Sequence, residues 1–392
     1  MKILLTTESY YPNIDGGAIA QRNLALELAK YGHDVRIIAP GDSFKNKIEE
    51  DQGTKIYRVK GLKFPLYMKS TYNFAPFPFF RVRKILKEFK PDVLQVCSPY
   101  PISVCTMAWA RKYNIPVVGA IHILPGNMLS AFYRLKSYEK FEKYAWKYLV
   151  FFYNLVDYAT VPTKTGGDMY KKRGFKNRIR AISNGIDTLK YNPNNNGQYL
   201  KKKFNLPNKK IVLYTGRINE EKNMEVLINA IPYVLKKIDA HFLICGGGGD
   251  YRLSLMEMAK EIGVFKNTTF PGFIDWKDYP NVYDLADVFV LTGESELQSL
   301  VTLEAVASGL PVVVVDEGAT HELAENDNGL VFKSKDSKQM AECIVKILSD
   351  DKLRLKMSKN SLNLVKKHSM ESVVRSYEEV YRKAIEIQKK KK

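Results

Sequence analysis

Short apolar runs and longer amphipathic segments alternate along the chain. The runs at residues 3–7, 35–40 and 93–97 are mostly apolar, which is typical of strands buried on both faces of a sheet. Between such runs, apolar residues recur at helical spacing, as at residues 18–31 and 81–89, and a Gly or a Lys-Pro pair follows each of these segments. This alternation predicts an α/β fold built on parallel sheets with right-handed crossovers.

A polar, turn-rich segment interrupts the alternation near the middle of the chain. Residues 192–197 have the sequence Asn-Pro-Asn-Asn-Asn-Gly, a composition typical of a linker. After it the pattern restarts with a strand-like run at 210–215 and a helical segment at 224–236. We therefore predict an N-terminal domain over residues 1–185 and a second domain over residues 186–372.

The end of the chain has a pattern of its own. Residues 373–392 follow the second domain, and the apolar side chains from Val373 to Ile385 form one stripe of a helix. We predict a C-terminal helix here, followed by a disordered basic end at residues 389–392.

Composition narrows the class of protein. The chain has 392 residues, 45% hydrophobic, and no apolar run near the roughly 20 residues that a membrane-spanning helix needs. Glu8 comes too early for a signal peptide, so we expect a cytoplasmic protein. The four cysteines have neither zinc-site nor disulfide-framework spacing, and no Asp-x-Asp sequence or His cluster is present. We therefore expect no metal and no cofactor.

Positive charge is concentrated in the first domain. Residues 1–185 hold 30 Lys and Arg against 14 Asp and Glu, a net charge of +16 out of the total of +19. Such asymmetry indicates a polyanionic partner, either nucleic acid or an anionic membrane.

The most informative motif lies between two apolar runs of the second domain. Residues 294–305 read Glu-Ser-Glu-Leu-Gln-Ser-Leu-Val-Thr-Leu-Glu-Ala, which places Glu296 and Glu304 eight positions apart. If the helix begins at Glu296, Glu304 lies about two turns further along on the same face. The strand-helix-strand context places Glu296 at the carboxyl edge of a parallel sheet, where open α/β sheets bind ligands.

This segment resembles the Glu-x7-Glu motif of family 4 retaining glycosyltransferases, and the Ser-Gly-Leu-Pro-Val-Val at residues 308–313 resembles that family too. The resemblance implies the GT-B fold, in which two doubly wound Rossmann-like domains face each other across a cleft and the C-terminal helix crosses back to the first. It assigns Glu296 to the sugar hydroxyls and Glu304 to the donor ribose. Ser299 stands before Leu300 where the family usually has Gly, and both residues are expected at the donor.

Further motifs resemble parts of the same family's donor site. Thr215-Gly216-Arg217 leads into Lys222 as in the family's Gly-Arg-Leu-x-x-x-Lys signature, whose cations bind the donor diphosphate. Two fixed cations suit a leaving diphosphate, on which negative charge develops. The resemblance also places Gly16 and Gly17 against the diphosphate, Phe273 at the base and His122, as a catalytic residue, at the junction of sugar and acceptor.

A basic, aromatic segment in the first domain indicates the acceptor. Lys136, Lys140, Lys143 and Lys147 recur at helical spacing beside an aromatic stripe, with Trp146 nearby. Cations beside aromatic rings suit an anionic membrane interface. We therefore expect a peripheral enzyme on the cytoplasmic face of the membrane, which transfers a hexose from a nucleoside-diphosphate sugar, UDP-glucose first, to a lipid such as diacylglycerol. The order Glu-Leu-Gln-Ser-Leu at residues 296–300 is nearest to the variant found in glycolipid-forming members.

Other functions remain open from the sequence. A GDP-mannose-dependent mannosyltransferase, or a transferase acting on a polysaccharide or another soluble acceptor, would carry the same motifs. A non-hydrolysing UDP-sugar epimerase shares the architecture, but the set of Arg217, Lys222, Glu296 and Glu304 argues against it. The charge also fits a basic nucleic-acid-binding protein, although no such binding motif is visible and nucleic acid is not an expected partner.

Overall fold

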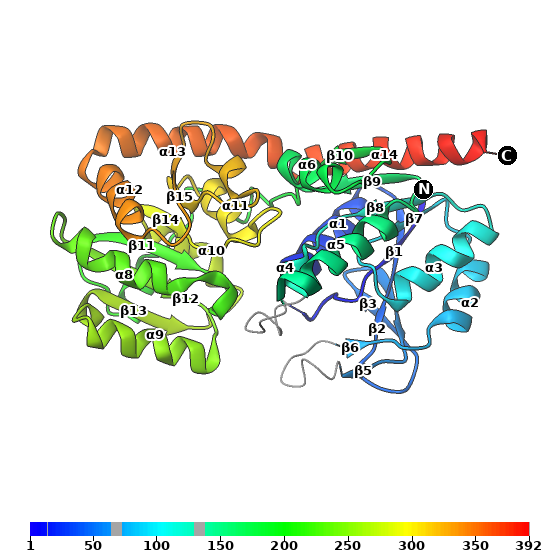
Figure 1. The fold of residues 1–392 in the computed structure, drawn as a ribbon, viewed down its shortest axis with the longest axis horizontal. Helices are drawn as coiled ribbons and strands as arrows, with labels where there is room; N and C mark the ends of the chain where they lie inside the picture. The colour runs from blue at the N-terminus through cyan, green and yellow to red at the C-terminus, as the bar shows by residue number, and fades with distance from the viewer. Residues whose placement is uncertain (14, 64–72, 129–137, 392) are drawn as a thin grey trace. The chain divides into compact units, whose positions relative to one another are not determined.

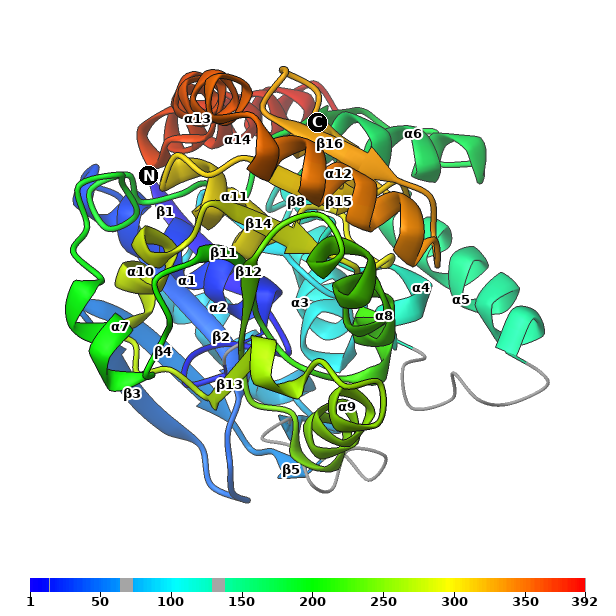
Figure 2. The ribbon, with the colours of Figure 1, turned by 90° about the vertical axis from the view of Figure 1, so that its left-hand side faces the viewer.

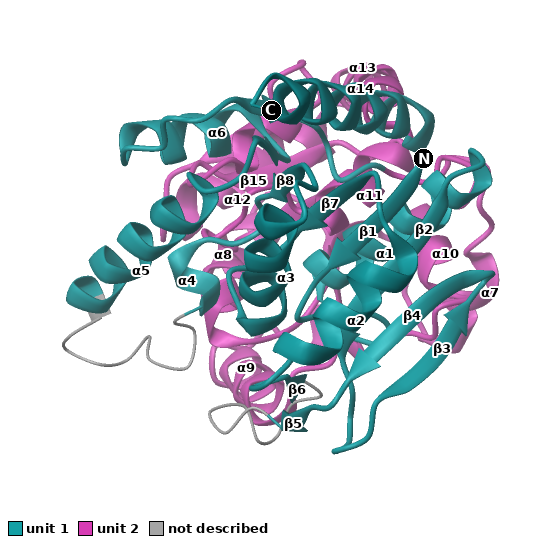
Figure 3. Ribbon diagram, turned by 90° about the vertical axis from the view of Figure 1, so that its right-hand side faces the viewer, with its two compact units in different colours: residues 1–185, 370–392 teal, residues 186–369 magenta. Residues whose placement is uncertain are grey.

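The computed structural model describes residues 1–13, 15–63, 73–128 and 138–391. These residues form two compact units, shown in different colours in Figure 3. Unit 1 comprises residues 1–185 and 370–392, and unit 2 comprises residues 186–369. The chain therefore leaves unit 1, builds unit 2 and returns to unit 1 with its last helix, α14, coloured red in Figure 1.

The sheet of unit 1 has the strand order β10-β9-β8-β7-β1-β2-β4-β3. Its pairs are parallel except for β3 with β4. The strands are β1 (Lys2–Thr6), β2 (Asp34–Pro40), β3 (Lys47–Asp51), β4 (Thr54–Val59), β7 (Val93–Val96), β8 (Val117–Ala120), β9 (Tyr158–Val161) and β10 (Ile179–Ala181). Two short strands, β5 (Leu62–Lys63) and β6 (Asn73–Phe74), pair separately.

Helices cover both faces of this sheet. The helices of unit 1 are α1 (Gly16–Lys30), α2 (Phe79–Phe89), α3 (Pro101–Lys112), α4 (Pro125–Met128), α5 (Tyr138–Tyr153), α6 (Lys164–Lys172) and α14 (Met370–Lys390). Helices α1 and α14 share one hydrophobic core with β1 and β2. On the other face, the hydroxyl of Ser103 in α3 lies 3.1 Å from that of Thr6 in β1.

The C-terminal helix α14 is part of the core of unit 1. Its buried stripe includes Val374 and Tyr381, and the Tyr381 hydroxyl donates a hydrogen bond of 2.6 Å to the buried side chain of Gln95 in β7. The predicted return of the C-terminal helix to the first domain is therefore confirmed. The prediction of a disordered basic end is wrong at Lys390, which is helical, because the helix outlasts its apolar stripe. Beyond it, Lys391 forms an ion pair of 2.6 Å with Asp157.

Unit 2 is built on a wholly parallel sheet with the order β13-β12-β11-β14-β15-β16. Its strands are β11 (Lys210–Thr215), β12 (Ala240–Cys245), β13 (Thr268–Gly272), β14 (Val288–Leu291), β15 (Val312–Val315) and β16 (Gly329–Phe332). Its α-helices are α7 (Gln198–Lys203), α8 (Met224–Leu235), α9 (Gly249–Glu261), α10 (Tyr279–Val282), α11 (Leu300–Ala307), α12 (Ser337–Ser349) and α13 (Asp351–Val365). The predicted α/β class is confirmed.

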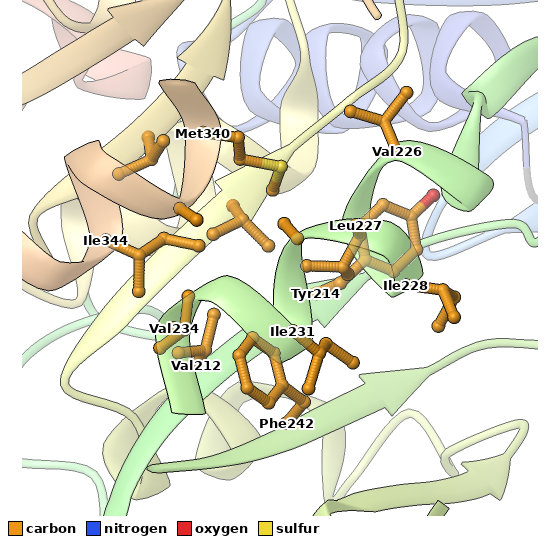
Figure 4. Close-up of a cluster of buried hydrophobic side chains, with 14 of the residues drawn as sticks. Val212, Tyr214, Val226, Leu227, Ile228, Ile231, Val234, Phe242, Met340 and Ile344 are labelled. Atoms are coloured by element: carbon orange, nitrogen blue, oxygen red, sulfur yellow. The ribbon is translucent and has the colours of Figure 1, made fainter. Parts of the chain in front are cut away.

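Alternate residues of the unit 2 strands point to two separate cores. On one face Val212 and Phe242 pack against α8 and α12, which lie side by side in Figure 2 (see also the close-up in Figure 4). On the other face Leu213 and Phe289 pack in a second core with residues of α11 and α13. Burial on both sides explains the nearly continuous apolar runs in the sequence. Because the sheet is parallel, the loops that follow its strands gather at one edge.

Candidate active site

The loop between β14 and α11 holds Glu296 beside a lysine. The Nζ atom of Lys222 lies 2.6 Å from Oε1 of Glu296, and both side chains are largely buried. Helix α11 begins only at Leu300, so the expectation that Glu296 and Glu304 share a helix face is wrong. Glu296 takes its position from the loop, where its carbonyl oxygen accepts a hydrogen bond of 3.2 Å from the amide of Ala319.

Ser299 caps helix α11. Its φ of −74° and ψ of 114° are ordinary for any residue, so Ser in place of Gly causes no backbone strain here. Its hydroxyl accepts hydrogen bonds from the amide of Thr302 at 3.2 Å and from the hydroxyl of Thr302 at 2.9 Å. Serine is a preferred N-cap residue because it satisfies an amide that the helix leaves unpaired. Leu300 is the first residue of the helix.

Arg217 and Lys222 follow β11, and Glu221 lies between them. Oε1 of Glu221 lies 3.1 Å from Nη2 of Arg217 and 3.8 Å from Nζ of Lys222. The Thr292 hydroxyl donates a hydrogen bond of 2.6 Å to the carbonyl oxygen of Lys222, which joins this segment to the end of β14. The structure therefore brings Arg217, Lys222 and Glu296 into one charged cluster, in which Glu221 is the second carboxylate.

Glu304 lies inside α11 with 7% of its surface exposed. The Tyr283 hydroxyl donates a hydrogen bond of 2.6 Å to its Oε2. Burial raises the pKa of Glu304 from its usual 4.5 to about 7, and hydrogen bonds from Tyr283 and Tyr191 oppose this rise. Glu304 therefore changes its protonation state near neutral pH.

Phe273 follows β13 and is exposed over 56% of its surface. Its ring meets Trp276 edge-on, and a series of ring contacts continues through Tyr279 to Tyr283, the partner of Glu304. The exposed end of this aromatic series is thus connected to Glu304 through side chains in contact.

In unit 1, Gly16 and Gly17 form the first turn of α1. The Asp15 side chain caps this helix by accepting a hydrogen bond of 3.0 Å from the amide of Ala18. A Cβ at Gly17 would lie 3.2 Å from the Asp15 carboxylate, which is tighter than most side-chain contacts. The missing side chains leave the helix start open to close approach by a ligand.

His122 follows β8 in unit 1. Burial lowers its pKa to about 4, and a hydrogen bond with Asn184 and the charge of Asp15 oppose the shift. Its Nε2 is buried and has no hydrogen-bond partner within the described parts of the chain. His122 is therefore a neutral imidazole at physiological pH, with a ring nitrogen available for a hydrogen bond.

Helix α5 exposes a face rich in lysine and aromatic residues. We call this the α5 face; its residues are Lys140, Phe141, Lys143, Tyr144, Lys147, Tyr148 and Phe151. Lys136, which we expected to extend it, lies outside the described residues. Trp146 does not belong to it, contrary to our expectation. Only 8% of Trp146 is exposed, because Tyr170 of α6 meets its ring edge-on and Arg173 lies 4.0 Å from the ring centre.

Four side chains contact a predicted site residue or are buried with a raised pKa, but were not predicted from the sequence: Glu8, Tyr191, Glu221 and Tyr283. Glu221 had a weak signal, its i, i+4 spacing from Arg217. Tyr191 and Tyr283 had none, since only the fold brings them to Glu304. Glu8 follows β1; its Oε1 accepts a hydrogen bond of 2.8 Å from the amide of Ile102, and burial raises its pKa to about 8.

No group of three or more His, Cys, Asp or Glu side chains in the described residues is arranged to hold a metal ion. Among the described helices, none has the length and apolar character needed to cross a membrane.

Comparisons with known proteins place the chain in a family. The model described as Glycosyltransferase Family 4 matches residues 14–190, and that described as Glycosyl transferases group 1 matches residues 198–363. An alpha-monoglucosyldiacylglycerol synthase of Streptococcus pneumoniae is 29% identical over 80% of this chain and 70% of its own length. A GDP-mannose-dependent alpha-mannosyltransferase of Corynebacterium glutamicum is 26% identical over 95% of this chain and 86% of its own length.

Solved structures agree on the fold. A sucrose-phosphate synthase from Thermosynechococcus elongatus superposes with a TM-score of 0.79 at 21% identity, over 97% of this chain and 98% of the other. Together with the two doubly wound units, the returning helix and the Glu-x7-Glu segment, these matches mean that the chain belongs to the family 4 glycosyltransferases of the GT-B fold and resembles its glycolipid-forming members.

Proposed function

We propose that the chain is a retaining glycosyltransferase that moves a hexose from a nucleoside-diphosphate sugar to a membrane lipid with a free hydroxyl. UDP-glucose is the first candidate donor and diacylglycerol the first candidate acceptor. The observation that carries the proposal is the contact of 2.6 Å between Lys222 and Glu296, with Arg217 joined through Glu221. This contact supports the proposal because cations suited to a diphosphate lie beside a carboxylate suited to sugar hydroxyls.

Each group has a task in this reaction. Lys222 and Arg217 stabilise the charge that develops on the leaving diphosphate. Glu296 accepts hydrogen bonds from the sugar, and Glu304, when ionised, accepts them from the ribose hydroxyls. The bond from the sugar C1 to the phosphate oxygen breaks, and a bond from C1 to the acceptor oxygen forms on the same face. The acceptor proton passes to the leaving phosphate, so the reaction needs no side-chain base.

His122 and the start of α1 supply the contribution of unit 1. A neutral imidazole orients a hydroxyl without adding charge, which suits a group at the junction of sugar and acceptor. The amides at Gly16 and Gly17 are suited to an anionic phosphate oxygen.

The α5 face supports a lipid acceptor. Its lysines suit anionic headgroups and its rings suit the boundary of the acyl chains. Each basic residue near such a surface contributes about 1 kcal/mol, so a few of them are enough to localise the enzyme on a membrane. The name of the Streptococcus pneumoniae relative, a glucosyldiacylglycerol synthase, also supports this acceptor.

We expect the quadruple replacement of Lys136, Lys140, Lys143 and Lys147 by Gln to weaken sedimentation with anionic liposomes by roughly tenfold or more. Binding to neutral liposomes should change little. A matched control replaces four exposed lysines of unit 2, Lys338, Lys346, Lys352 and Lys359, by Gln. If the quadruple variant sediments with anionic vesicles as the wild type does, the α5 face is not the docking surface.

Two alternatives have specific support. A GDP-mannose donor is favoured by the name of the Corynebacterium glutamicum relative. A nucleic-acid partner is favoured only by the net charge of +19. A panel of UDP- and GDP-sugars with diacylglycerol in mixed vesicles, analysed for glycolipid product and anomeric configuration, decides the donor and the stereochemistry. Glycolipid formation from GDP-mannose alone would replace the first candidate donor, and salt-sensitive binding to RNA or DNA without any transfer would overturn the proposal.

A further inference from the structure

The charged cluster in unit 2 has no net charge. Arg217 and Lys222 are its cations, and Glu221 and Glu296 are its carboxylates. An anionic ligand that approaches Lys222 therefore meets cations that already have counterions. Glu296 has a proposed task at the sugar, but Glu221 has none in the reaction.

The position of Lys222 does not depend on Glu221. The Lys222 amide donates a hydrogen bond of 3.0 Å to the carbonyl oxygen of Asn219, and the Thr292 hydroxyl donates one to the carbonyl oxygen of Lys222. Its stem passes close to Gly293, where an added Cβ would lie 3.0 Å from the Lys222 Cδ. Its ammonium contacts Glu296 at 2.6 Å and Glu221 only at 3.8 Å.

The ion pair with Glu221 also contributes little to holding the Arg217 side chain in position. Its side chain is 46% exposed, and a partly exposed i, i+4 pair typically stabilises by only a few tenths of a kcal/mol. The Glu221 side chain, in contrast, is only 14% exposed, and its Oε1 faces both cations. Its negative charge is therefore poorly screened by solvent and acts on both.

We propose that Glu221 limits the affinity of Arg217 and Lys222 for a diphosphate, so that the nucleoside diphosphate leaves after transfer. This inference rests on the proposed function and names a residue that acts through the two cations. Tight binding of the leaving group would accelerate the bond-breaking step but would also hold the product. A fixed carboxylate beside the cations reduces both effects, and product release is the slow step in many enzymes.

Two substitutions separate the charge of Glu221 from its contacts. Glu221→Gln keeps an oxygen that accepts the Arg217 hydrogen bond and removes the charge, whereas Glu221→Ala removes both. Glu220→Gln makes the same change in net charge one residue earlier, on an exposed side chain, and serves as the control. Thermal melting of all three verifies that the fold is retained.

Isothermal titration of the full chain with UDP and with GDP gives the first readout. We expect Glu221→Gln and Glu221→Ala both to bind the preferred diphosphate roughly 5- to 20-fold more tightly at low salt, with a steeper salt dependence. Glu220→Gln should stay within about twofold of the wild type. In turnover, Glu221→Gln should lower kcat while the single-turnover rate rises, because bond breaking is accelerated and release of the diphosphate is slowed.

Other outcomes overturn the inference in distinguishable ways. Weaker binding by Glu221→Ala with wild-type binding by Glu221→Gln would mean that Glu221 supports Arg217 by contact. Unchanged binding in both would mean that it has no role in diphosphate affinity. If the wild type binds neither UDP nor GDP, the proposed function fails as well.

Discussion

The loop of Glu296 and the interior of α11 hold the same residue type in opposite environments. Glu296 meets an ammonium at 2.6 Å, whereas Glu304 is buried and accepts its hydrogen bond of 2.6 Å from a phenol. An ammonium compensates the charge of a carboxylate, but a phenol stabilises that charge without cancelling it. Burial then raises the pKa of Glu304 to about 7. The two glutamates of one motif thus differ in how their negative charge is compensated, because one has an ammonium as its nearest partner and the other a phenol.

The largest effect should come from Glu296. We expect Glu296→Gln or Lys222→Ala to lower the transfer rate at least about 100-fold, because each removes a charged group aimed at the reacting atoms. Thermal melting should shift by only a few degrees, since both side chains retain some solvent exposure.

The matched control for this prediction is Glu294→Gln, two positions earlier, where the side chain accepts a hydrogen bond of 2.5 Å from Ser334. Single-turnover rates compare the variants. Near wild-type transfer by Glu296→Gln would mean that Glu296 does not act in the reaction, so only Glu304 would remain as a functional glutamate of the motif.

Burial of Glu304 should appear in the stability of the protein. Its folded pKa of about 7 lies above the usual 4.5, so the unfolded chain loses this proton first as the pH rises. The contribution is therefore fully present below about pH 4.5 and is lost as the pH rises through 7. Glu304→Gln should remove a difference on the order of 3 kcal/mol in the free energy of unfolding between pH 4.5 and 8. Denaturant unfolding at the two values measures it, and an unchanged pH dependence would contradict this account.

The phenol should set where donor binding begins to fail in acid. Tyr283→Phe removes a hydrogen bond that lowers the pKa of Glu304, so the carboxyl should remain protonated to higher pH. We expect the rise in the donor KM at acid pH to begin roughly 1 pH unit higher than in the wild type. At neutral pH the donor affinity should be a few-fold lower. Phe289→Leu, which alters a ring contact of Tyr283 without removing a hydroxyl, is the control. The same shift in both variants would point to packing instead of the hydrogen bond.

Chelation should have the smallest effect. Arg217 and Lys222 supply positive charge for the diphosphate, so we expect the rate after exhaustive chelation to stay within about twofold. A rate that disappears and returns only with a divalent ion would mean that these two cations do not perform the task assigned to them.

Much of this arrangement could be predicted from local sequence. Strand β11 has the bounds that its apolar run indicated, and Glu296 and Lys222, which the motifs singled out, are in contact. The helical spacing inferred for Glu296 failed because Ser299 caps α11 three residues later. The Ser299 side chain bonds to the backbone at the helix start, so the helix begins after it. The residues before Ser299 form a loop and do not follow helical spacing.

Tertiary packing explains the rest. Trp146 is close in helical spacing to Lys143, yet α6 covers it through Tyr170, which follows it by 24 positions. Tyr283 reaches Glu304 only because the elements that carry them meet in the second core of unit 2. No local pattern encodes such contacts, since they depend on which helix packs beside which strand.

The hydrogen bond between Tyr381 and Gln95 has a consequence for biosynthesis. Synthesis proceeds from the N-terminus, so β7 leaves the ribosome long before α14 exists. Unit 2, encoded entirely in between, has all its strands and helices while the core of unit 1 still lacks the side chains of Val374 and Tyr381. A chain that ended before residue 370 would therefore contain every element of the second unit but leave the hydrophobic core of the first unit uncovered where α14 packs.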